Sequence, residues 1–127
     1  MRIRHKIWFE QDGKVLFGTG RYELFKAIDE THSLNAAAKK LNMSYRAAWG
    51  RLKASEERMG MKLVERSKGR GMYLTTGATM LLKQFDQLES AMGTFLQKTG
   101  QILSSSIEGK GENRSVEKHA NNFDSGD

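Results

Sequence analysis

The residues best suited to chemistry on a partner surface form a short run of polar, aromatic and basic side chains near the middle of the chain. They are Ser44, Tyr45, Arg46 and Trp49, all within six consecutive positions. A serine at this place can cap a helix that starts at Tyr45, which leaves the tyrosine and the arginine in an exposed first turn. There, Arg46 can donate a forked pair of hydrogen bonds to guanine in a DNA major groove. A phosphate contact is the competing role, and it would add affinity without sequence preference.

The other candidates near this helix also have two interpretations each. Tyr45 can meet a phosphate or a thymine methyl group, or it can pack against the wing. Trp49, one turn later, can face DNA or form a wedge between helices, and the sequence favours neither. We expect Arg51 and Lys53 to contact the DNA backbone.

Positive charge is concentrated around this helix. The whole chain has a net charge of +6, and residues 39–70 hold ten lysines and arginines against three glutamates, so ten minus three gives +7 for that segment alone. Such a segment predicts a polyanionic partner, nucleic acid before anionic lipid, although a solvated basic face is the simpler alternative.

The elements around the run must position it. Ser33 can cap a preceding helix whose small residues Ala36, Ala37 and Ala38 allow a close crossing, so residues 33–60 predict a helix-turn-helix. Two short apolar runs follow, separated by residues 67–71, and predict a basic hairpin that is typical of a winged helix. At its tip, Lys68 and Arg70 can reach a minor groove or phosphates. Upstream, the sequence predicts a β-hairpin from Arg2 and a helix from about Thr19 to Thr31.

The last predicted helix spans residues 76–99 and carries an apolar seam. Its apolar residues are spaced 3, 4, 3, 4 and 3, as in a coiled coil. We expect this seam to join two copies of the chain, because about 24 helical residues span about 36 Å and exceed what a small domain covers. Packing on the chain's own core is the alternative. The dimerisation residues predicted here are Leu81, Phe85, Leu88, Met92 and Phe95.

The fold class predicted is therefore mainly α with small β-hairpins, a winged helix-turn-helix with a long C-terminal dimerisation helix. Residues 1–75 form the winged domain with its N-terminal hairpin, residues 76–99 the long helix, and residues 100–127 a disordered polar tail. The tail is rich in Ser, Gly and Asn and poor in apolar residues.

Composition argues against several other classes of protein. The chain has no cysteine, and His5, His32 and His119 are too scattered for a metal site. No phosphate-binding loop and no ordered nucleophile can be recognised, so we predict no enzyme, no cofactor and no metal. No apolar run reaches membrane-spanning length and no signal peptide is evident, so we expect a cytoplasmic protein.

With these motifs placed, the chain resembles a known family. Residues 35–38 (NAAA), 43–49 (MSYRAAW) and 63–66 (LVER), with Leu74-Thr75 after the wing, are similar to the N-terminal domain of ModE-type molybdate-responsive transcriptional regulators. The LysR-type winged domain is a more distant likeness. Matches at Trp8-Phe9-Glu10 extend the resemblance over about residues 3–90.

The resemblance implies sequence-specific binding of double-stranded DNA by a homodimer, with the recognition helix beginning at Ser44. Full-length members carry C-terminal oxyanion-binding domains, and the present sequence ends before such a domain. We therefore expect a separate signal-sensing protein or another signal. The alternatives are a winged-helix protein-interaction module and a small molybdate- or oxyanion-responsive regulator.

Overall fold

The computed structural model describes residues 1–67 and 69–109. These residues divide into two compact units, one made of Lys6–Glu89 and the other of Met1–His5 with residues 90–109. The unit of Lys6–Glu89 contains every element of the predicted DNA-binding domain, and each unit is described by itself.

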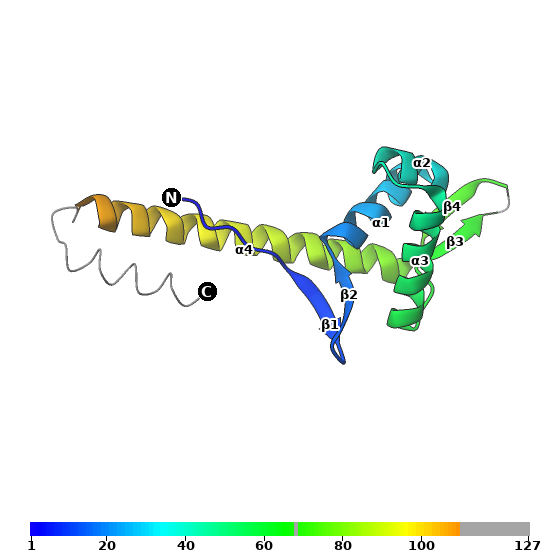
Figure 1. Cartoon of the computed structure of the whole chain (residues 1–127), viewed down its shortest axis with the longest axis horizontal. Coiled ribbons are helices and arrows are strands. Elements are labelled where there is room, and N and C mark those ends of the chain that lie inside the picture. Colours follow the sequence, from blue (N-terminus) through cyan, green and yellow to red (C-terminus); the bar gives the residue numbers. More distant parts are fainter. Residues whose placement is uncertain (68, 110–127) are drawn as a thin grey trace. The chain divides into compact units, whose positions relative to one another are not determined.

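Two antiparallel hairpins and four helices follow one another in the described chain. The elements are β1 (Trp8–Gln11), β2 (Lys14–Gly18), α1 (Thr19–Thr31), α2 (Leu34–Lys40), α3 (Tyr45–Met59), β3 (Val64–Ser67), β4 (Gly71–Leu74) and α4 (Thr76–Gly109). In Figure 1, α1, α2 and α3 gather beside the β3–β4 hairpin, and α1 contacts α2, α3 and β4. This is the predicted winged helix-turn-helix, mainly α with two small hairpins.

The core of the larger unit is built around aromatic rings. Phe17 and Phe85 are 0% and 2% exposed, and their ring centroids lie 5.3 Å apart in an edge-to-face arrangement. Phe25 and Phe9 also pack against Phe17, with ring centroids 6.3 and 6.2 Å away. Leu24 from α1 is buried beside them. Burial of such rings contributes the largest share of core stabilisation, so α1 and the start of α4 are fixed by the same cluster.

The helix ends agree closely with the sequence signals. The side-chain oxygens of Ser33 and Ser44 accept hydrogen bonds from the amides of Ala36 and Ala47, each at 3.0 Å. Gly60 ends α3 in the left-handed conformation, which glycine adopts without strain. These observations confirm both predicted serine caps and the predicted end of α3.

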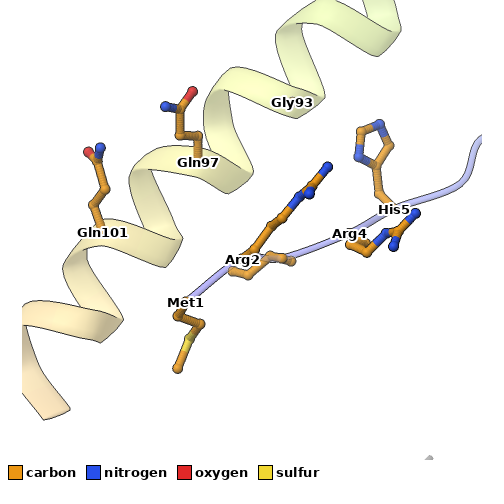
Figure 2. Close-up of a pocket in the computed structure, with 8 residues that line it drawn as sticks. Met1, Arg2, Arg4, His5, Gly93, Gln97 and Gln101 are labelled. Carbon is orange, nitrogen blue, oxygen red and sulfur yellow. The ribbon is translucent and has the colours of Figure 1, made fainter.

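The N-terminal hairpin is shorter than predicted. Its first strand starts at Trp8, and the expectation of a strand from Arg2 was wrong. Met1–His5 instead lie along α4 within the smaller unit, beside Gly93, Gln97 and Gln101 (Figure 2). An added Cβ on the buried Gly100 would stand 3.2 Å from the carbonyl oxygen of Met1, so glycine permits this approach. Met1–His5 therefore lie against a helix and belong to no strand.

The final helix is longer than predicted. It continues to Gly109, so the expected end at Thr99 and the expected polar tail from residue 100 were wrong for residues 100–109. Gly100 does not end the helix, because one glycine in a helix costs only about 1 kcal/mol. Ile102 lies one heptad after Phe95. The remaining part of the predicted tail, residues 110–127, lies outside the described residues.

Part of the predicted dimer seam belongs to the chain's own core. Phe85 is 2% exposed within the aromatic cluster, and Leu81 packs against the same core. The assignment of Phe85 to the dimer seam was wrong, because residues of the same chain already cover it, whereas Leu81 is only partly buried. Leu88, Met92 and Phe95 are 40%, 36% and 64% exposed.

Among the described residues, no helix is both long and apolar enough to cross a bilayer.

Candidate nucleic-acid interface

The start of α3 presents the predicted contact residues to solvent. Tyr45 and Trp49 are 47% and 39% exposed, and Arg46 is exposed as well. Ala48 and Leu52 of the same helix are fully buried and hold it against the core. The capping bond of Ser44 leaves the first turn ordered, so these side chains project from a fixed helix end.

Trp49 lies at the edge of the helix and does not belong to the core. The ammonium nitrogen of Lys53 stands 4.6 Å from the centroid of the Trp49 ring, a distance suited to a cation–π contact. Both residues line a groove between α3 and the wing, together with Lys62, Glu65 and Arg66. The structure thus excludes the interpretation of Trp49 as a wedge buried between helices.

A buried carboxylate links this part of α3 to the wing. Glu56 is 9% exposed, and its Oε2 accepts hydrogen bonds from the amides of Leu63 at 2.9 Å and Val64 at 3.4 Å. Its Oε1 lies 3.3 Å from the ammonium of Lys53. Burial alone would raise the pKa of Glu56, but these amides and Lys53 together lower it below its ordinary value. Glu56 therefore stays charged and fixes where β3 starts relative to α3.

The base of the wing is held by the turn between α1 and α2. The carbonyl oxygen of His32 accepts a hydrogen bond from the amide of Met72 at 2.9 Å, and the His32 ring stacks on Tyr73 with centroids 4.3 Å apart. Gly71 has φ of +101°, and a Cβ there would stand 2.5 Å from the same carbonyl oxygen. Only glycine fits, so the wing leaves the body at one defined place.

At the wing tip, Arg70 is exposed and its amide closes a turn onto the carbonyl oxygen of Ser67 at 3.0 Å. Lys68, the other predicted contact, lies outside the described residues. The hairpin itself and its position beside α3 agree with the predicted wing.

Arg51 occupies a different side of α3 from Lys53. The two positions differ by two residues, and at about 100° per residue their side chains project in roughly opposite directions around the helix. A guanidinium nitrogen of Arg51 lies 3.5 Å from the position that a Cβ would take on Gly20, at the start of α1. The predicted contacts of α3 therefore divide between two flanks, one toward the wing and one toward α1.

Two positioning residues were missed from the sequence. Glu56 was counted only as an opposing charge, although it follows the core residue Leu52 by four positions and so falls on the buried side of the helix. His32 precedes the Ser33 cap and adopts a left-handed φ of 56°. The sequence gives no signal that predicts this conformation. A charged residue at a core position was the available signal for Glu56, and His32 offered none.

Comparison with known proteins agrees with this geometry. Residues 20–79 match the family described as bacterial regulatory helix-turn-helix protein, lysR family. These residues form a LysR-type helix-turn-helix domain. They include α1, α2, α3 and the wing, the parts that hold the candidate interface.

The chain is also similar to a regulator and to solved DNA-binding domains. It is 40% identical to the transcriptional regulator ModE of Haemophilus influenzae over 73 residues, which are 54% of this chain and 29% of the relative. The domain in the crystal structure of the CbnR_DBD–DNA complex is 27% identical with a TM-score of 0.52, covering 65% of this chain and 93% of that one. The BenM_DBD/benA site 1 DNA complex gives 25% identity and a TM-score of 0.53, covering 65% and 92%.

Both solved structures support the winged helix-turn-helix architecture. The present chain spans under a third of the length of the ModE relative. The family and the ModE relative are regulatory, both solved domains are in complexes with DNA, and none of these matches is an enzyme.

Proposed function

We propose that this chain is a DNA-binding transcriptional regulator that reads duplex sequence through the start of α3. The observation that carries the proposal is the exposed set Tyr45, Arg46 and Trp49 on a capped helix, in a segment of net charge +7. A helix with a free, basic first turn matches the donor and acceptor pattern of a major groove. The CbnR and BenM domains, which share the fold, were crystallised with DNA.

In this proposal the contacts have separate roles. Arg46 reads a base, and Tyr45 and Trp49 make apolar contacts with neighbouring bases or sugars. Arg70 and Lys68 contact phosphates or an adjacent minor groove. Lys53 supports Trp49 and completes a positive edge along the groove toward the wing.

The regulator acts as a homodimer through the part of α4 that its own core leaves uncovered. Leu88, Met92 and Phe95 are exposed and spaced four and three residues apart, as in a helix-pair seam. Two recognition helices would then enter major grooves about 34 Å apart on a partly symmetric site. A cytoplasmic location follows from the function proposed.

The decisive experiment compares specific and random duplexes. Fragments selected from genomic DNA by the wild-type chain supply the specific duplex. We expect Arg46→Ala to weaken specific binding about tenfold or more, which equals the loss of about 1.4 kcal/mol, while random binding changes little. The matched variant Arg70→Ala removes one exposed positive charge from the wing, and it should weaken both duplexes alike.

Equal losses on both duplexes for Arg46→Ala would remove its base-reading role. No binding to any duplex at low salt would instead favour the protein-interaction module. Calorimetry with molybdate and tungstate tests the oxyanion-responsive alternative, and a heat of binding would support it.

A further inference from the structure

Three arginines gather on the flank of α3 that faces away from the wing. Arg51 and Arg58 are seven residues apart, so they project from the same side of α3 two turns apart. Arg21 comes from the first turns of α1, and its Nε donates a 2.8 Å hydrogen bond to the hydroxyl of Ser55. Ser55 in turn donates to the carbonyl oxygen of Arg51 at 2.7 Å.

Backbone contacts hold the group in place. Arg58 donates from Nη1 to the carbonyl oxygen of Val15 at 2.9 Å, which ties it to β2. Arg51 reaches the start of α1 near Gly20. Three guanidinium groups from two helices are therefore brought together at the junction of α1, α3 and β2.

Among the described residues, no ion pair is found for these three arginines. Asp12 and Glu57 line the same pocket as Arg58, so carboxylates lie near one end of the group. The first turn of α1 carries no acidic residue. Burial lowers the pKa of Arg21 below its ordinary value, and the neighbouring positive charges of Arg58 and Arg51 lower it further.

Arginines clustered in this way match the chemistry of phosphate. A guanidinium offers several donors in a planar fork that fits two phosphate oxygens, and a bound anion would relieve the mutual repulsion. The duplex is the favoured source of that phosphate, because α3 lies between this cluster and the wing. A helix seated in a major groove meets one phosphate backbone along each flank.

We propose that Arg21, Arg51 and Arg58 form a phosphate clamp for the DNA backbone on the side of α3 opposite the wing. The clamp rests on the proposed function and adds to it: it fixes the depth and tilt of α3 from the second strand. It supplies affinity without sequence preference, in contrast to Arg46.

The test is the salt dependence of duplex binding. Each phosphate contact contributes about 0.9 to the slope of log K against log salt. We expect the double variant Arg51→Gln/Arg58→Gln to lower that slope by about 1 to 2 and to weaken random and specific duplexes by the same factor. Lys83→Gln, which removes one exposed positive charge from α4, is the control for net charge and should change the slope far less.

If these arginines have a purely structural role, the folded double variant should keep the wild-type slope. If phosphate is their partner, Arg58→Lys should keep a slope near the wild-type value, because lysine keeps the charge although it cannot reproduce the fork. Circular dichroism and urea unfolding establish that each variant is folded. A folded double variant with an unchanged slope overturns the clamp alone, whereas a wild-type chain that binds no duplex overturns the proposed function together with it.

Discussion

The two halves of α4 carry the same spacing of apolar residues but meet different surroundings. In the first half, Ala78 and Phe85 are each 2% exposed within the core of the larger unit. In the second half, Phe95 and Ile102 are 64% and 65% exposed among the described residues. A heptad seam therefore indicates that a helix has an apolar side, but it does not indicate which residues or which partner cover that side.

The difference has a simple origin in the elements that precede α4. Phe9 and Phe17 of the first hairpin and Tyr22 of α1 supply rings around Phe85, with centroids 5.5, 5.3 and 5.2 Å away. Among the described residues, residues 90–109 share their unit with Met1–His5, a short segment rich in basic residues. The first half is therefore part of a domain core, whereas the second half leaves large apolar side chains exposed.

The largest expected effect comes from truncating the buried half. Phe85→Ala should destabilise the domain by about 3–5 kcal/mol, because it removes a ring that touches three others and leaves a cavity. Urea unfolding followed by circular dichroism measures the loss. Phe95→Ala, measured at a concentration where the chain is monomeric, is the matched variant and should cost under about 0.5 kcal/mol. Similar losses of stability for Phe85→Ala and Phe95→Ala would contradict the difference in burial between the two halves of α4.

Placing a charge on the exposed half tests what covers it. Phe95→Asp should raise the dissociation constant of the homodimer at least tenfold, or about 1.4 kcal/mol, since a carboxylate would be buried in an apolar seam. Sedimentation equilibrium measures the constant. Thr94→Asp adds the same charge at the neighbouring exposed position and should leave the constant nearly unchanged. A monomeric wild-type chain at every concentration would contradict the dimer.

Glycines in the exposed half give a smaller and opposite effect. A Cβ on Gly93 would meet no atom within 4 Å, so Gly93→Ala should stabilise the helix by about 0.5–1 kcal/mol through reduced backbone entropy. Gly100→Ala should gain less, because its Cβ would stand 3.2 Å from the carbonyl oxygen of Met1. The urea midpoint for unfolding of α4 measures the effect of both substitutions. A loss for Gly93→Ala would indicate that a partner chain approaches closely there.

The smallest effect concerns a hydrogen bond at the edge of the buried half. The Tyr22 hydroxyl donates to a carboxylate oxygen of Asp86 at 3.1 Å, and burial and then this bond raise the pKa of Tyr22. A raised pKa stabilises the fold below about pH 10, and that contribution is lost as the pH rises through the folded value. Tyr22→Phe should cost about 0.5 kcal/mol at neutral pH. Tyr22→Phe should also reduce the loss of unfolding free energy above about pH 10, measured by urea unfolding at several pH values. An unchanged loss would show that Tyr22 does not cause it.

The local features of this chain could be predicted because their causes are local. Ser33, Ser44 and Gly60 mark helix ends through bonds or dihedral angles that involve only their neighbours. The basic wing between two short apolar runs could be predicted as well, because turn residues and strand residues follow one another over a few positions. These signals sufficed for the winged helix-turn-helix and for the exposed start of α3.

Features that depend on distant residues could not be predicted from the same signals. Glu56 binds amides seven and eight positions later, and Arg21 meets Ser55 across thirty-four positions. Spacing places Glu56 on the buried side of α3, but it does not identify the partners of Glu56 or of Arg21, because these partners become neighbours only in the folded chain. Helical spacing separates Arg51 from Lys53, but only the fold decides that one flank of α3 faces the wing and the other faces α1.

The sequence by itself determined the helix-turn-helix, the basic wing, the positive charge around them and an apolar seam on the last helix. Only the tertiary structure decided that Phe85 belongs to the core while Phe95 faces solvent, and that Arg51 points away from the wing. The physical reason is that capping, turns and periodicity act over a few residues, whereas burial depends on which elements fold over a given side chain.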